Sequence, residues 1–131
     1  MPILLLSSRS SELTALLRSD AERALWWGTI VECLSALHRQ RREGRLSLAL
    51  VEQGTRRLAG LVEDSDVIDP TSLLRDQAGR LVATHPLRAA DAFQLAAALA
   101  WCDGASVGES FVCLDERLRE TAQHEGFASL P

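Results

Sequence analysis

The 131-residue sequence contains no tyrosine, and tryptophan and phenylalanine together make up only 5% of it. Excess positive charge is also missing. The formal net charge is −4 at pH 7, so the chain as a whole has no electrostatic footprint for binding nucleic acid. What remains is a globular composition, 47% hydrophobic and 24% charged. The length suits one ordinary domain and no repeat or low-complexity linker divides it, so we predict a single domain over residues 1–131.

The three cysteines, Cys33, Cys102 and Cys113, do not form the pattern of a disulfide framework or a zinc site. Their odd number, the lack of a CxxC pair and their apolar neighbours indicate reduced, buried thiols in a reducing compartment. None of the three histidines has a zinc-ligand spacing to these cysteines, and we expect the histidines at the surface or in loops.

Long hydrophobic runs are absent as well. The longest apolar stretch, in AAALAW, is too short to cross a bilayer, and MPILLL is shorter than a signal peptide and lacks its basic flank. We therefore expect a cytoplasmic protein with no membrane partner.

Short apolar runs alternate with longer segments of helical periodicity. Runs at 24–27, 66–70 and 110–115 suit strands, and the opening run PILLL suits either a strand or a helix. Helices are predicted over residues 7–20, 28–44, 47–64, 72–86, 88–102 and 116–127. Helices that alternate with short, nearly all-apolar strands imply a parallel sheet covered on both faces, so the predicted fold class is α/β.

Three acidic residues attract attention, although each has an ordinary structural explanation. Glu32 follows Thr29 by three residues, which is the spacing of a capping box at a helix start. Asp91 falls in the first turn of an Ala-rich helix, where the helix dipole favours a negative charge by about 0.3–1 kcal/mol. Asp115 directly follows an apolar strand and suits the N-cap of the next helix.

Taken together, the same three residues suit a divalent cation. Asp115 lies at the carboxyl end of a predicted strand, where ligands bind in parallel α/β sheets, and Glu32 begins the helix after another strand. Asp91 instead begins a helix that leads into a strand, which places it at the opposite pole of a simple crossover unless the topology brings it across. Clustered carboxylates suit Mg²⁺ or Mn²⁺, ions that prefer oxygen ligands and can activate a bound water.

Three longer segments carry a family resemblance: WWGTIVECLSALHRQRREGRLS, HPLRAADAFQLAAALA and FVCLDERLRETAQHEGF. In order and spacing they resemble PIN-domain proteins, especially the VapC-type toxins of bacterial toxin–antitoxin pairs, from about Ser10 to the C-terminus. The resemblance implies a three-layer α/β/α sandwich with a short parallel sheet. It also implies a Mg²⁺- or Mn²⁺-dependent endoribonuclease that acts on structured RNA such as tRNA or rRNA, binds a cognate antitoxin and forms a homodimer.

The resemblance assigns the three acids to a metal-binding catalytic site. Glu32 matches the helix-starting Glu of the family, Asp91 the Asp of its (A)ADA motif, and Asp115 the Asp after its later strand. By the family's topology, the helix start at Asp91 approaches the acidic crevice. There the acids hold one or two metal ions that position and activate water for attack on an RNA phosphodiester.

The N-terminal segment departs from the family pattern, which begins with a strand that ends in Asp followed by Ser or Thr. This sequence has no acidic residue before Glu12. In one alignment, PILLL is that strand and Ser7 or Ser8 replaces the Asp. In the other, which we favour because SRSSELTALL resembles the family's next helix, PILLLSS is a remnant of the first helix and the strand is missing. The alternative function is a catalytically impaired PIN remnant that binds an antitoxin or itself.

Arginines and tryptophans leave further interpretations open. Arginines cluster around the end of the helix that begins near Glu32, where they contact RNA phosphates or form a solvated end that complements the helix dipole. Arg88 either pairs with Asp91 or faces RNA. Trp26 and Trp27 are adjacent in a predicted strand, so they point to opposite faces and at least one belongs to the core, although either ring could stack on a base. The clustered arginines are Arg39, Arg41, Arg42 and Arg45.

Overall fold

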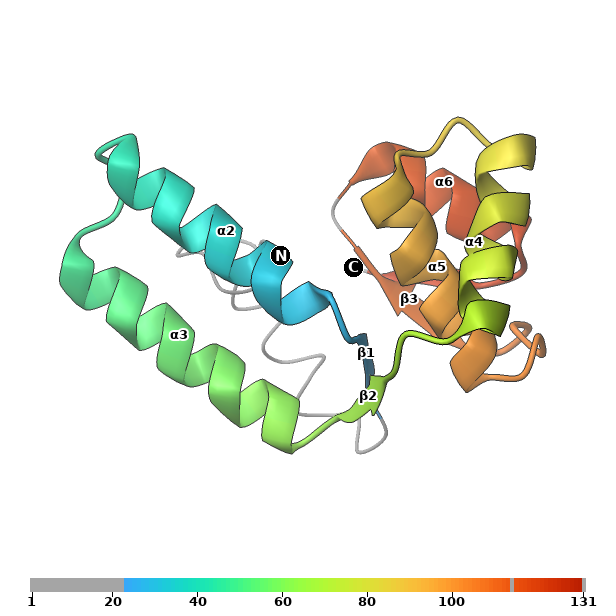
Figure 1. Ribbon diagram of the computed structural model, residues 1–131, viewed down its shortest axis with the longest axis horizontal. Helices are drawn as coiled ribbons and strands as arrows, with labels where there is room; N and C mark the ends of the chain where they lie inside the picture. Colours follow the sequence, from blue (N-terminus) through green and yellow to red (C-terminus); the bar gives the residue numbers. More distant parts are fainter. Residues whose placement is uncertain (1–22, 114, 131) are drawn as a thin grey trace. The chain divides into compact units, whose positions relative to one another are not determined.

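The computed structural model describes residues 23–113 and 115–130 as helices joined by very short strands (Figure 1). The elements are β1 (Ala24–Trp26), α2 (Thr29–Arg42), α3 (Leu48–Glu63), β2 (Asp66–Ile68), α4 (Ser72–Thr84), α5 (Ala89–Trp101), β3 (Ser110–Val112), α6 (Glu116–His124) and β4 (Ala128–Leu130). The predicted helix at 7–20 and the two alignments of PILLL lie outside the described residues. Within the described ranges, no helix is both long and apolar enough to cross a membrane.

The described chain forms two compact units. The first, the hairpin unit, contains Gly28–Asp66, and the second, the α/β unit, contains Ala24–Trp27 and everything described from Val67 onward. Each unit has its own cluster of buried hydrophobic side chains.

In the hairpin unit, α2 and α3 pack side by side through a small apolar core (Figure 1). The predicted apolar stripe of α2 is confirmed, because Leu37 is fully buried and Ile30 and Leu34 pack against the same core. Gly54 of α3 lies against the Leu37 side chain, and the absence of a side chain there lets the two helices approach closely. The buried residues of this core are Cys33, Leu37, Val51 and Leu58.

Turn and cap residues define the ends of this hairpin. Helix α2 ends at Arg42, and Gly44 follows with a positive φ of +78°, a conformation that glycine adopts without steric cost. Helix α3 begins where the Ser47 hydroxyl accepts a hydrogen bond from the Leu50 N–H at 3.2 Å. The predicted helix boundaries are confirmed here to within a few residues.

In the α/β unit, α5 is the central helix and contacts α4, α6 and β1. Five of its residues are buried, Ala92, Leu95, Ala96, Ala97 and Leu99, so the middle of this apolar segment is covered by neighbouring elements. Burying one leucine such as Leu95 contributes about 1.5–3 kcal/mol. The buried core residues are Leu74, Ala78, Leu81, Ala92, Leu95, Ala96, Ala97, Leu99, Phe111, Leu118, Ala122 and Phe127.

The described strands form two pairs, β1 with β2 and β3 with β4. The β3–β4 pair is parallel, with Ser110 opposite Ala128 and Val112 opposite Leu130. The mixed α/β class predicted from the sequence is thus confirmed, with short parallel strands and a large share of helix. Strand β4 was not predicted, and the described strands do not join into one sheet with a helical layer on each face.

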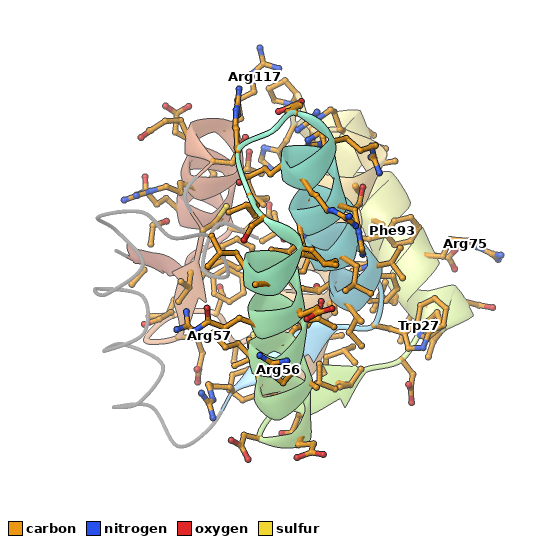
Figure 2. The ribbon with its side chains drawn as sticks, turned by 90° about the vertical axis from the view of Figure 1, so that its left-hand side faces the viewer. Trp27, Arg56, Arg57, Arg75, Phe93 and Arg117 are labelled. Atoms are coloured by element: carbon orange, nitrogen blue, oxygen red, sulfur yellow. The ribbon has the colours of Figure 1, made fainter. Side chains whose placement is uncertain are left out.

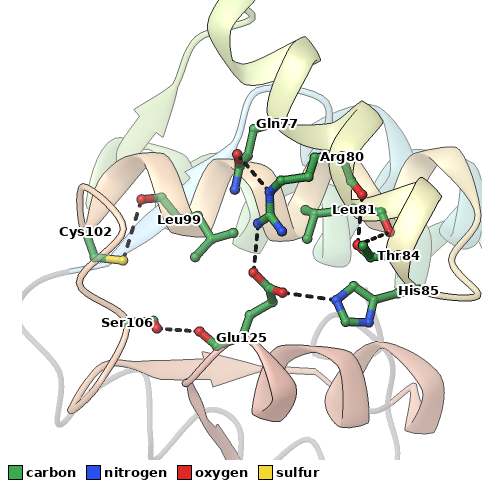
Figure 3. Close-up of polar contacts among 9 residues, drawn as sticks. All are labelled: Gln77, Arg80, Leu81, Thr84, His85, Leu99, Cys102, Ser106 and Glu125. Atoms are coloured by element: carbon green, nitrogen blue, oxygen red, sulfur yellow. Dashed lines mark hydrogen bonds and ion pairs between the residues drawn. The ribbon is translucent and has the colours of Figure 1, made fainter.

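Glu125 ties the end of α4 to the end of α6 (Figure 3). Its carboxylate accepts a hydrogen bond from Arg80 at 2.8 Å and lies 3.0 Å from the Nε2 atom of His85. Its backbone carbonyl accepts a hydrogen bond from the Ser106 hydroxyl. Partial burial opposes ionisation of this carboxyl, but the hydrogen bonds from Arg80 and His85 and their charges outweigh burial and hold its pKa below the ordinary value.

Candidate functional site

Asp115 is the N-cap of α6, as its position after the strand predicts. Its Oδ1 atom accepts a hydrogen bond from the Leu118 N–H at 3.0 Å, which satisfies one of the free donors at the helix start. The residue is exposed, so the second carboxylate oxygen stays accessible. Asp115 therefore caps the helix through one carboxylate oxygen and keeps the other oxygen available for a second contact.

Asp91 lies in the first turn of α5, where the sequence places it. Its side chain is only 20% exposed, and the residue that follows it, Ala92, is fully buried. The Arg88 Nε atom lies 3.6 Å from Asp91 Oδ2, so pairing, one of the two interpretations of Arg88, is observed. Arg88 remains 81% exposed, and an ion pair so open to solvent contributes little to stability.

Asp91 and Asp115 line one open pocket of about 280 Å³ in the α/β unit. The starts of α5 and α6 both meet this pocket, so the topology brings Asp91 across to Asp115 despite the argument from a simple crossover. The pocket is lined by Pro86, Arg88, Asp91, Asp115, Glu116 and Arg117.

Two charged residues of this pocket, Glu116 and Arg117, were not singled out in the sequence. The signal that could have found them is their position directly after Asp115, in the first turn of the same helix. Figure 2 shows the Arg117 side chain extending from α6 into solvent. The pocket thus combines carboxylates with guanidinium groups at the positive ends of two helix dipoles, an environment that attracts both cations and anions.

The charges of both acids of the pocket affect the pKa of the Cys113 thiol. Burial raises its pKa, and the negative charges of Asp115 and Asp91 raise it further, against a hydrogen bond from the Asp115 backbone at 3.3 Å. Cys113 is therefore held as the neutral thiol near neutral pH, which disfavours a role as a nucleophile.

Glu32 lies in the first turn of α2 and is half-buried. The capping box predicted from Thr29 is wrong: the N-cap is Gly28, one residue earlier, and no side chain makes the capping hydrogen bond. Thr29 is instead the first helical residue and is 3% exposed, so its hydroxyl is taken into the packed interior. Glu32 belongs to the hairpin unit, and its membership of the same site as Asp91 and Asp115 stays a prediction.

The clustered arginines have the geometry of a helix end. Arg39, Arg41 and Arg42 occupy the last turn of α2, where positive charge complements the helix dipole, and Arg45 pairs with Glu43 at 3.5 Å. Arg39 and Arg42 are exposed. Their contact with RNA phosphates stays a prediction.

The pocket residues can be compared with the needs of a Mg²⁺ or Mn²⁺ ion. In the ranges 23–113 and 115–130, no three histidine, cysteine or acidic side chains are arranged as a ready metal site. Mg²⁺, however, keeps several waters and is often bound by one or two carboxylates together with substrate phosphates. Asp91 and Asp115 supply two such carboxylates and Glu116 a third nearby, while no histidine lines the pocket. This donor set fits a hard cation and not zinc.

Comparison of the chain with protein-family models, with curated proteins and with solved structures finds no match. The chemistry of the pocket and the sequence motifs therefore provide the basis for a functional proposal.

Proposed function

We propose that this protein is a metal-dependent endoribonuclease of the PIN-domain type, similar to VapC toxins, which hydrolyses RNA phosphodiester bonds at the pocket of Asp91 and Asp115. The observation that supports it most strongly is the convergence of these two acids, from the starts of different helices, on one pocket with two arginines. The proposal includes a cytoplasmic location, a cognate antitoxin and a homodimer.

In this function, Asp91 and Asp115 hold Mg²⁺ or Mn²⁺, with Glu32 as the third acid that the family pattern assigns. The ion supplies a bound water of lowered pKa and stabilises charge on the phosphate. Arg117 and Arg88 bind phosphate oxygens, since guanidinium groups match them in a bidentate manner. Arg88 is free to turn from Asp91 toward a phosphate because its side chain is mostly exposed.

The test is cleavage of labelled tRNA and rRNA by the purified full chain with Mg²⁺ or Mn²⁺. We expect Asp91→Asn and Asp115→Asn each to lower the cleavage rate at least about 100-fold, because removing a group that stabilises transition-state charge has effects of this size. Asp76→Asn, which neutralises an exposed acid on α4 outside the pocket, is the matched control and should leave the rate unchanged. Equal cleavage in EDTA, or by Asp91→Asn, would rule out the metal site.

We also keep the alternative function, in which the catalytic site is impaired. In that case the chain is a non-catalytic module that binds an antitoxin or itself. It predicts no metal-dependent cleavage by purified protein together with a dimer mass in sedimentation equilibrium. A monomer that cleaves RNA would exclude it.

A further inference from the structure

A guanidinium group already accompanies Asp91 in the candidate pocket. The Arg88 Nε atom lies 3.6 Å from the Asp91 Oδ2 atom at the start of α5, and both residues line the pocket. Among the residues that the structure describes, Asp91 has no other ionic partner. Because only 20% of the Asp91 side chain is exposed, its carboxylate is largely cut off from water and is costly to keep ionised without a positive charge nearby. Arg88 supplies that charge.

The pair between Arg88 and Asp91 is weak enough to be exchanged for another contact. Arg88 is 81% exposed, and the 3.6 Å separation is longer than the roughly 2.7–2.9 Å of a hydrogen bond between charged groups. Ion pairs so open to solvent contribute little to stability. Arg88 is also the N-cap residue of α5, but its side chain makes no capping hydrogen bond. The guanidinium can therefore leave Asp91 without loss of a helix cap.

Arg88 and a divalent cation compete for the Asp91 carboxylate. Two cations beside one carboxylate repel each other, so an ion that binds Asp91 drives the guanidinium away from it. Pairing with Arg88 in turn lowers the apparent affinity for the ion. The second guanidinium of the pocket, that of Arg117, forms no ion pair within residues 23–113 and 115–130. Arg117 thus carries the same charge as Arg88 but lacks its link to Asp91.

We propose that Arg88 is a counter-ion of Asp91 that a divalent metal ion displaces, and that the displaced guanidinium then binds a phosphate of the RNA substrate. This inference rests on the proposed ribonuclease function and adds a coupling between its two ligands. Metal binding frees Arg88 for phosphate and so raises the affinity for RNA. By thermodynamic linkage, RNA raises the affinity for the metal by the same factor.

The first measurement is Mn²⁺ binding to the full chain without RNA, followed through the electron paramagnetic resonance signal of free Mn²⁺. Arg117→Gln is the matched control, since it removes a guanidinium from the same pocket without breaking a pair with Asp91. We expect Arg88→Gln to tighten Mn²⁺ binding about 1.5- to five-fold more than Arg117→Gln does, which is the strength of an exposed ion pair expressed as a ratio of affinities.

The second measurement is binding of a fluorescein-labelled oligodeoxythymidylate, which carries backbone phosphates but is not RNA, in EDTA and in saturating Mn²⁺. Mn²⁺ should strengthen binding to the wild type. In Arg88→Gln, we expect this enhancement to be smaller by the same factor of about 1.5 to five, because one ion pair accounts for both effects.

Equal Mn²⁺ affinities of the Arg88→Gln and Arg117→Gln proteins would overturn the inference, as would an equal enhancement by Mn²⁺ in the wild type and in Arg88→Gln. Either result together with metal-dependent RNA cleavage would refute the displacement of Arg88 and leave the ribonuclease intact. The expected effects of Arg88→Gln without any RNA cleavage would refute the ribonuclease alone. A wild-type protein that binds no Mn²⁺ would refute both.

Discussion

Gly126 occupies a position where both the backbone conformation and the surrounding space require a residue without a side chain. It follows α6 with a φ of +101°, and a Cβ atom there would collide with the Ser106 hydroxyl, which bonds to the adjacent Glu125 carbonyl. Neither the backbone nor this contact accepts an ordinary L-residue without rearrangement.

We expect Gly126→Ala to lower the free energy of unfolding by at least about 2 kcal/mol, as measured by urea denaturation. Gly79→Ala is the control within the same unit, since Gly79 is an exposed helical position on α4 with open space around its Cα. That substitution should raise stability by about 0.5–1 kcal/mol through helix propensity. Equal effects of the two substitutions would contradict this account of Gly126.

Glu125 makes the free energy of unfolding depend on pH in the acidic range. A carboxyl group whose pKa is lower in the folded protein stabilises the fold above its ordinary pKa of about 4.3, and this contribution disappears as the pH falls through the lower folded-state value. The cause is the pair of hydrogen bonds from Arg80 and His85, which require the ionised form.

We therefore expect Glu125→Gln to cost about 1–2 kcal/mol of unfolding free energy at pH 6, and the difference from the wild type to shrink below about pH 4. Thermal unfolding from pH 3 to pH 7 provides the measurement. Glu120→Gln, at an exposed position of the same helix, should show no such trend. A Glu125 effect that stays constant down to pH 3 would be inconsistent with a depressed pKa.

At the scale of elements, Asp115 combines a helix cap with a place in the pocket, and substitutions can separate the two. Asparagine retains an oxygen that caps a helix but loses the negative charge, whereas alanine loses both. We expect Asp115→Ala to lower stability by about 0.5–2 kcal/mol and Asp115→Asn to change it little, while under the proposed function both lower the rate of RNA cleavage at least about 100-fold.

Thr71→Ala provides the converse control. Thr71 caps α4 by accepting a hydrogen bond from the Leu74 N–H at 3.1 Å, away from the pocket. Its replacement should cost similar stability in the same melting assay and leave cleavage unchanged. Loss of cleavage in Thr71→Ala would show that the assay reports stability and not chemistry.

Local signals in the sequence were sufficient for most of the helices. The caps at Ser47 and Asp115, and the stripe of Ile30, Leu34 and Leu37, act within one or two turns, so they can be read without knowledge of the rest of the fold. The predicted capping box at Thr29 is wrong because the Thr29 side chain is buried in the packed interior, and the N-cap lies one residue earlier, at Gly28.

Features that depend on distant partners could not be read in this way. Strand β4 is a three-residue segment, Ala128–Leu130, whose pairing with β3 supplies the order that its own sequence does not. The meeting of Asp91 and Asp115 likewise depends on how α5 and α6 start relative to each other. Spacing along the chain carries no information on that geometry.

At the scale of the whole molecule, a net charge of −4 offers RNA no general attraction, so binding must depend on local cations. If Arg88 and Arg117 are the phosphate contacts, the logarithm of affinity for single-stranded RNA should fall with the logarithm of salt concentration with a slope of about −1.4.

The measurement is fluorescence titration of an oligonucleotide over a series of salt concentrations. Arg88→Gln and Arg117→Gln should each reduce the slope by about 0.7, and Arg75→Gln, at an exposed position on α4 outside the pocket, should not. A much steeper slope that is reduced by Arg39→Gln and Arg42→Gln would instead assign the hairpin unit to RNA contact.

Asp115 both caps α6 and lines the pocket, and these two roles together affect how the sequence can change over generations. Under the proposed function, a copy that had ceased to cut RNA would still tend to retain an oxygen-bearing side chain at this position, because the Asp115 carboxylate also caps α6 and selection for folding would preserve that cap. Asp91 has a weaker structural duty, because it contributes only the favourable interaction with the helix dipole and an ion pair with a solvent-exposed arginine. Under drift, the acid on α5 would therefore disappear first, and its persistence in descendants would be the better sign that the chemistry is still under selection.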